Sequence, residues 1–209
     1  MYWIKTPWYV KAVYPGLIWN MSGQKEIYLT FDDGPVPVVT EKVLELLSRY
    51  NAASTFFCIG ENIKKHPDLF DRIINEGHTI GNHTYNHLNG WKSKDEEYIN
   101  NIEACNTLAN SNLFRPPYGR IGIKQIQHLR NQYRIIMWDV LSGDFDVAQT
   151  PESCADNVIQ HTESGSIVVF HDSEKAKHNV LGALPLVLKY FSEKGFTFKP
   201  LPKAMNEFN

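Results

Sequence analysis

The 209-residue sequence has few cysteines, no excess charge of one sign and no long apolar run. Its three cysteines, Cys58, Cys105 and Cys154, are too few and too widely spaced for a disulfide framework or a zinc knuckle, so we expect reduced thiols. The formal net charge is −2, and acidic and basic residues are interleaved. Charge therefore gives no indication of a nucleic acid partner or of an anionic membrane surface.

The sequence also lacks signals for export. No stretch of about 18 apolar residues occurs, and polar residues and prolines interrupt the first twenty positions, unlike the apolar region of a signal peptide. We therefore expect a cytoplasmic protein without membrane association, with attachment to the cell envelope as the alternative.

Aromatic residues are concentrated at the start of the chain, at Tyr2, Trp3, Trp8, Tyr9, Tyr14 and Trp19. Pro7 and Pro15 would interrupt a continuous amphipathic helix, which argues against an interfacial membrane anchor. We expect residues 1–25 to be an arm packed on a single domain formed by residues 26–209.

From residue 26 onward, short β-rich runs alternate with stretches of helical period. The expected strands are 26–31, 54–59, 78–82, 113–114, 133–138, 166–170 and 196–199, and the expected helices are 38–50, 67–76, 95–110, 123–130, 151–161 and 180–194. Regular alternation with mostly apolar strands predicts a parallel sheet covered by helices. Seven strands without a glycine-rich nucleotide loop favour a distorted (β/α)7 barrel, similar to a TIM barrel.

Polar residues follow the expected strands at their carboxyl ends. Asp32 and Asp33 follow the first strand, His83 the third, Arg115 the fourth and His171 the sixth. In a barrel of parallel strands these ends meet at one face, where active sites are formed.

The stretch Leu29–Pro35, LTFDDGP, places two like charges side by side, and HTYNH places His83 and His87 four residues apart. Two imidazoles on one face, joined by a carboxylate from another strand end, suit zinc or a similar divalent ion. One aspartate would then bind the ion and the other would act as a base for the attacking water. The alternative is a solvated turn, and the residues alone do not assign the two aspartates.

The segment FRPPYGR is expected to be stiff because two prolines precede a glycine. Its rigidity would aim the amide of Tyr118 at one point, as an oxyanion requires, and Arg115 would hold one of the aspartates. A rigid loop with a surface ion pair is the competing interpretation.

Two further segments contribute candidates to the same rim. His171 in IVVFHDS would serve as a general acid or be structural. In MWDVLSGDF, either Asp139 or Asp144 would orient His171 or Arg115, whereas Trp138 and Phe145 would line a sugar site or pack in the core.

Taken in order, TFDDGP, HTYNH, RPPYG, WDVLSGDF and VFH resemble the polysaccharide deacetylases, the NodB-homology carbohydrate esterases of family 4. The resemblance spans residues 26 to 199 and implies a barrel that uses a divalent metal, usually zinc with cobalt, nickel or manganese as alternatives, to remove acetyl groups from N-acetylated sugars. It implies that Asp32 is the base and that Asp33, His83 and His87 bind the metal. By the same resemblance Arg115 positions Asp32, the Tyr118 amide binds the oxyanion and His171 is the acid, with Asp144 counted among the catalytic residues and Pro117, Trp138 and Phe145 among those that bind substrate.

The sequence departs from the family pattern in its fourth motif, where many members have Asp at the position of Leu141 and Trp at that of Phe145. The partner of His171 is therefore open, with Asp139, Asp144 or Asp172 as substitutes. We expect a metal-dependent hydrolase acting on an N-acetylated sugar or glycan. The alternatives are a deacylase of another substrate and a glycan-binding protein without turnover, which Leu141 favours.

Overall fold

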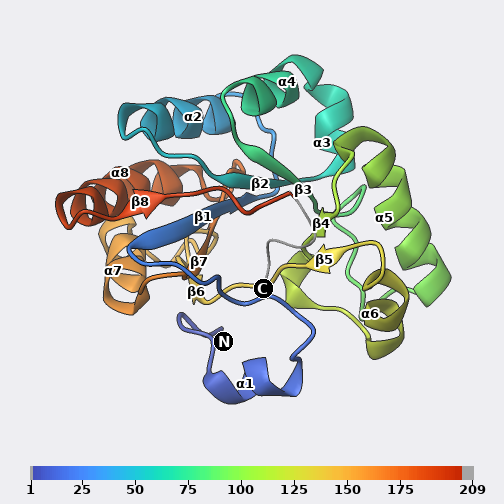
Figure 1. Cartoon of the computed structure of the whole chain (residues 1–209). Coiled ribbons are helices and arrows are strands. Elements are labelled where there is room, and N and C mark those ends of the chain that lie inside the picture. Colours follow the sequence, from blue (N-terminus) through green and yellow to red (C-terminus); the bar gives the residue numbers. More distant parts are fainter. Residues whose placement is uncertain (1, 204–209) are drawn as a thin grey trace.

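Strands and helices alternate along the chain in the computed structural model, which describes residues 2–203 (Figure 1). The strands are β1 (Glu26–Asp32), β2 (Thr55–Cys58), β3 (Thr79–Asn82), β4 (Leu113–Phe114), β5 (Arg134–Ile135), β6 (Val140–Leu141), β7 (Ile167–His171) and β8 (Thr197–Phe198). The helices are α1 (Trp8–Val13), α2 (Val39–Arg49), α3 (Gly60–Lys65), α4 (Pro67–Asn75), α5 (Asp95–Ala109), α6 (Ile123–Leu129), α7 (Pro151–His161) and α8 (Lys177–Glu193), with a 3-10 turn at Pro117–Gly119. Among the described residues no helix has the length and apolar character needed to span a bilayer.

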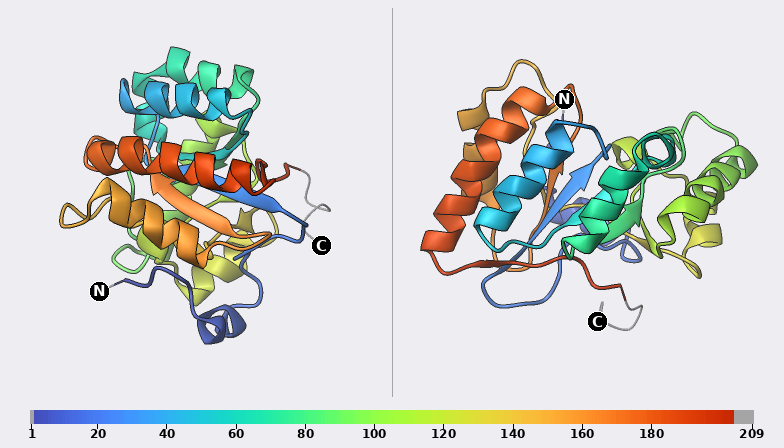
Figure 2. Two further views of the ribbon diagram at one scale, coloured as in Figure 1. Left: turned by 90° about the vertical axis from the view of Figure 1, so that its left-hand side faces the viewer. Right: turned by 90° about the horizontal axis from the view of Figure 1, so that it is seen from above.

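The strands form one curled parallel sheet in the order β5-β4-β3-β2-β1-β7-β6, and β8 pairs with the start of β1. Helices α2 to α8 surround the sheet on its outer face (Figures 1 and 2). The edge strands β5 and β6 are not paired with each other in the part of the chain that is described, so the barrel is open on that side. The predicted distorted barrel of seven parallel strands is confirmed by β1 to β7.

Strand β1 shows how the alternation of side chains builds this barrel. Ile27, Leu29 and Phe31 pack into the large core shared with the helices, whereas Tyr28 belongs to a small cluster with Phe57 and residues of other strands. Because side chains alternate along a strand, Thr30 and Asp32 lie on the same face as Tyr28, inside the barrel. The interior is therefore apolar at one end and polar at the carboxyl ends of the strands.

The N-terminal segment lies along the open side of the barrel. Ile18 pairs with Ile136 after β5, and Lys5 pairs with Val140 of β6. The buried Asp139 carboxylate, between these two strands, accepts from Lys5 Nζ at 2.7 Å and from Lys11 Nζ at 2.5 Å. Residues 2–20 thus bridge β5 and β6 through backbone pairing and through ion pairs to the buried Asp139 carboxylate.

Several expected elements differ from the structure. The expected strand 133–138 is wrong beyond residue 135, because the following residues pair with the N-terminal segment before β6 begins. Helices α1 and α3, with six residues each, and the two-residue strand β6 were not predicted. The expected seventh strand, 196–199, contains β8, which lies outside the seven-strand path.

Candidate active site

The turn after β1 directs its two aspartates to different partners. Asp32 is the last residue of β1 and points into the barrel, whereas Asp33 has a left-handed backbone with φ of 85°. The side-chain amide of Asn62 donates to the Asp33 carbonyl at 2.7 Å and holds this turn. A change of backbone region between the two residues therefore separates two carboxylates that are adjacent in sequence.

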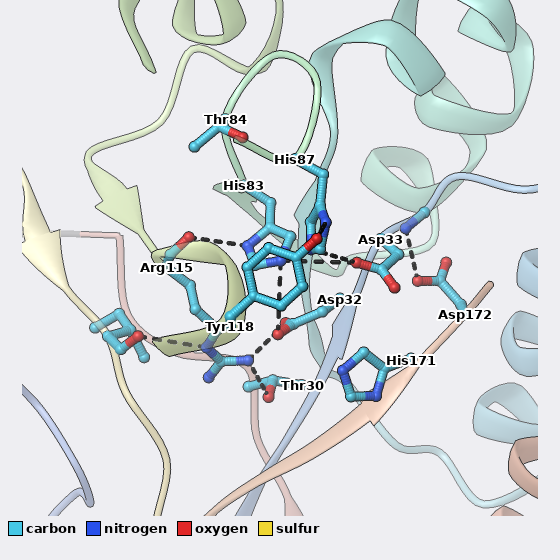
Figure 3. A network of polar contacts seen from close by, with 12 residues as sticks. Thr30, Asp32, Asp33, His83, Thr84, His87, Arg115, Tyr118, His171 and Asp172 are labelled. Carbon is cyan, nitrogen blue, oxygen red and sulfur yellow. Dashed lines mark hydrogen bonds and ion pairs between the residues drawn. The ribbon is translucent and has the colours of Figure 1, made fainter. Parts of the chain in front are cut away.

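Three ligand atoms converge at this turn (Figure 3). The Asp33 Oδ1 atom lies 3.3 Å from His87 Nε2 and 3.7 Å from His83 Nε2, and the three atoms lie within 4.8 Å of one another. The Nδ1 atom of His83 lies 2.9 Å from the carbonyl oxygen of Arg115, to which it can donate only in the tautomer that leaves Nε2 free. Burial lowers the pKa of His83 to about 4, which keeps this imidazole neutral.

These residues fit a divalent ion. Asp33 Oδ1 is buried and accepts no hydrogen bond from any described residue, although burying a carboxylate oxygen without a partner is costly. Two imidazole nitrogens and this oxygen match the ligand set of a catalytic zinc site, with positions left for water or substrate. The donor chemistry therefore supports the predicted metal site.

Asp32 is held by a fully buried arginine. Arg115 Nη1 donates to Asp32 Oδ1 at 2.7 Å and to the Thr30 hydroxyl at 2.7 Å. The guanidinium also donates to two backbone carbonyls and stacks on the ring of Phe57, 4.1 Å from its centroid. Burial alone would raise the pKa of Asp32, but the charge of Arg115 more than offsets it, so the pKa is lowered and the carboxylate is ionised.

His171 lies beside Asp32, because the two residues are register partners on β7 and β1. Its Nδ1 atom bonds Asp144 Oδ1 at 2.7 Å, and its backbone amide donates to Asp144 Oδ2 at 2.7 Å. Burial by itself lowers the pKa of His171, but the charge and hydrogen bond of Asp144 outweigh it and raise the pKa to about 9. The ring is therefore protonated at neutral pH.

The partner of His171 resolves the departure noted in the fourth motif. Asp144 is fully buried and contacts both the ring and the backbone of His171, whereas Asp139 is engaged by lysines and the Ser166 hydroxyl. Leu141 is buried on β6, and the carboxylate that contacts His171 comes from Asp144 instead. Of the three aspartates considered as substitutes, Asp144 is therefore the one that contacts the His171 ring, so this contact does not need an aspartate at position 141.

Tyr118 lies in the 3-10 turn after β4, beside His87. Its backbone is left-handed, with φ of 61°, and its hydroxyl lies 3.1 Å from His87 Nδ1. Within residues 2–203 no backbone carbonyl accepts from the Tyr118 amide, which is therefore free to bind another acceptor. Pro117 is buried and opens the turn that presents this residue.

The two predicted aromatic residues lie in different places. The Phe145 ring is 5.2 Å from the His171 ring, centroid to centroid, and so lies at the site. Trp138 is half-buried and lines an adjacent apolar cavity together with Tyr118.

One positioning residue, Asp172, was considered from the sequence only as a partner for His171, whereas in the structure it contacts the turn after β1. Asp172 is fully buried and accepts from the Gly34 amide at 3.0 Å and from the Thr40 hydroxyl at 2.6 Å. A Cβ atom at Gly34 would overlap this carboxylate. Asp172 therefore fixes the turn that carries Asp33, and its only signal in the sequence was a second acidic group at a strand end, directly after His171.

The curled parallel barrel and the two-histidine, one-aspartate cluster at its carboxyl end define the class of a metal-dependent hydrolase. The family model for polysaccharide deacetylases matches residues 20–133. A peptidoglycan-N-acetylglucosamine deacetylase from Bacillus cereus is 35% identical over 211 residues, covering 96% of this chain and 74% of that protein. A chitooligosaccharide deacetylase from Azorhizobium caulinodans is 33% identical over 201 residues, covering 87% and 95%.

A solved structure shows the same relationship in three dimensions. A peptidoglycan N-acetylglucosamine deacetylase in complex with 4-naphthalen-1-yl-N-oxidanyl-benzamide superposes with a TM-score of 0.85 at 34% identity, covering 94% of this chain and 95% of that chain. The chain therefore belongs to the polysaccharide deacetylase family, as its motifs indicated.

Proposed function

We propose that this protein removes acetyl groups from the N-acetylglucosamine units of a glycan, releasing acetate and a free amine. The observation that carries the proposal is the pairing of an ionised Asp32, held by Arg115, with a protonated His171, held by Asp144, on neighbouring strands. One residue can take a proton and the other can give one, as hydrolysis of an amide requires. The names of the relatives from Bacillus cereus and Azorhizobium caulinodans support the substrate class.

Asp33, His83 and His87 would hold the metal, and we propose zinc because two nitrogens and one carboxylate oxygen suit it. When bound, a divalent ion supplies Lewis-acid polarisation of the amide carbonyl and acidifies water.

The protein's own groups account for the proton transfers. Asp32 takes a proton from water as the water oxygen bonds to the acetyl carbon, and the carbonyl π electrons move to its oxygen. The free amide of Tyr118 donates to the developing oxyanion. The electrons then re-form the carbonyl as the C–N bond breaks, and His171 gives its proton to the departing nitrogen. Arg115 acts through Asp32, keeping it ionised and oriented.

The test is acetate release from N-acetylglucosamine oligomers by the purified protein, with metal content measured before chelation, after chelation and after return of zinc. Cobalt, nickel and manganese are returned in parallel to identify the preferred ion. Activity should disappear with the metal and reappear with it.

Three variants separate the roles. Asp32→Asn should keep one metal per chain and lose at least about 100-fold in turnover, whereas His87→Ala should lose both metal and turnover. His128→Ala, which removes an exposed histidine from α6, is the matched control and should change neither. Parental turnover by Asp32→Asn would show that another group is the base.

A further inference from the structure

An apolar cavity of about 300 Å³ lies beside the candidate site, between the N-terminal segment and the loop that carries Tyr118. Seven of its fourteen lining residues are aromatic, and none is charged. Tyr2, Trp3 and Tyr14 line it from the N-terminal segment, whereas Trp91 and Trp138 line it from the barrel. The cavity exists only because the N-terminal segment closes the open side of the barrel.

Four polar side-chain groups of the cavity wall are bonded within the protein. The indole N–H groups of Trp19 and Trp91 donate to backbone carbonyls at 3.4 and 3.0 Å. The Thr6 hydroxyl donates to the Trp138 carbonyl at 2.8 Å, and the Tyr2 hydroxyl donates to Asp146 at 2.9 Å. The wall therefore offers mainly carbon to a ligand, and a bound sugar would find few partners for its hydroxyls.

The cavity adjoins the candidate site through two of its lining residues, Tyr118 and Tyr2. On one side Tyr118 lines the cavity while its hydroxyl lies 3.1 Å from His87 Nδ1. On the other side the Tyr2 ring is 5.1 Å from the ring of Phe145, which lies 5.2 Å from that of His171. A molecule whose acetamido group lies at the site can therefore reach the cavity with an attached group.

We propose that this cavity binds an apolar group, an alkyl or aryl aglycone, attached to the N-acetylated sugar. The inference rests on the proposed function for the sugar part, whereas the binding of the apolar group follows from the cavity itself. Trp3, which is 54% exposed, stands where such a group would enter from solvent. The preferred substrate class is thus an amino sugar glycoside with an apolar tail, such as a lipid-linked sugar.

The experiment compares the methyl and octyl β-glycosides of triacetylchitotriose, below the micellar concentration, by calorimetric binding and by acetate release. Each methylene sheltered from water strengthens binding about fourfold, so a chain that is only partly sheltered should lower the Kd and KM at least about 20-fold. Unmodified tetraacetylchitotetraose is included, because it tests whether the cavity prefers another sugar ring.

Two variants act on the cavity and one acts as a control. Val10→Trp places an indole in the cavity and should reduce the preference for the octyl glycoside to less than about threefold. Trp3→Ala, at a half-exposed position, should reduce it about fivefold or more. Trp8→Ala removes the same ring from α1 at a position that is 79% exposed and does not line the cavity, and should leave the preference intact.

Equal Kd values for the methyl and octyl glycosides would overturn the inference, as would a loss of preference in Trp8→Ala equal to that in Val10→Trp. A gain for the tetrasaccharide that Val10→Trp abolishes, without a gain for the octyl chain, would show that the cavity binds sugar instead. If the octyl glycoside binds preferentially and no glycoside releases acetate, the cavity inference stands and the proposed deacetylase activity fails.

Discussion

Replacing Asp144 with asparagine should move the pH dependence of the reaction. In the parent protein the Asp144 carboxylate raises the pKa of His171 to about 9 against the effect of burial. Asparagine removes the largest of the charges that raise the pKa, so the pKa should fall toward the ordinary value of 6.5, because burial is then opposed only by the weaker effects of Asp33 and Asp32. A general acid must be protonated, so activity falls as rising pH deprotonates it. In the variant this alkaline decline should begin at a lower pH than in the parent.

The size of the effect follows from the two pKa values. At pH 8 a group with a pKa of about 9 is about nine-tenths protonated, whereas one with a pKa of 6.5 is about 3% protonated, a difference of about 30-fold. At pH 5.5 both forms are mostly protonated. The ratio of kcat at pH 5.5 to kcat at pH 8 should therefore rise about 30-fold in Asp144→Asn, whatever loss of orientation lowers both rates.

The assay is acetate release between pH 5 and 10, with metal content measured at each end. Asp156→Asn, at an exposed position of α7, is the matched control and should follow the parent profile. If the alkaline decline of Asp144→Asn coincides with that of the parent, either His171 is not the acid or Asp144 does not set its pKa. Because folding raises the pKa of His171, the same pair should stabilise the fold fully below about pH 6.5 and lose that contribution as pH rises through about 9.

Two further predictions concern the stability of the fold and use urea unfolding. Arg115→Met should lower the free energy of unfolding by about 3–5 kcal/mol, because it leaves Asp32 buried without its cation, and it should cost much less when combined with Asp32→Asn. Additive losses in the double variant would argue against coupling between Arg115 and Asp32. The control Arg120→Met, at an exposed position, should lower the free energy of unfolding by less than about 1 kcal/mol. Asp139→Asn should lower the free energy of unfolding by only about 2 kcal/mol, because Lys5 and Lys11 remain partly solvated. It should also increase amide hydrogen exchange of residues 4–20. Unchanged exchange there would show that backbone pairing alone holds the segment.

The fold could be predicted where each element carries its own pattern. Helices such as α2 were found because their apolar residues recur at helical spacing, and β1 and β7 were found because they are short β-rich runs that are buried along nearly their whole length. The two-residue strands β5 and β6 carry no such period, and their ends are set by pairing with the distant N-terminal segment. Nothing in the sequence near Ile136 shows that its partner is Ile18.

The site could be predicted as far as residue type and strand position allow. The family pattern assigned different roles to Asp32 and Asp33, and the structure shows that a left-handed backbone at Asp33 separates their side chains. The partner of His171 was open because Asp144 lies in the loop between β6 and α7, and the path of that loop decides whether its carboxylate reaches the ring. Asn62 acts through a hydrogen bond that no motif reveals, and Thr30, although it begins the TFDDGP motif, gives no sign in the sequence that its hydroxyl accepts from Arg115.

Three residues of the site, Asp33, His87 and Tyr118, hold left-handed backbones although none is glycine. Each such conformation costs about 1–3 kcal/mol, which the surrounding fold must offset. Random search for thermostable variants should therefore repeatedly select glycine or asparagine at these positions, because such replacements relieve strain while removing a metal ligand or a neighbouring group. At these few residues, a substitution that increases thermal stability is expected to lower turnover. A screen that scores only survival at high temperature would therefore select inactive variants.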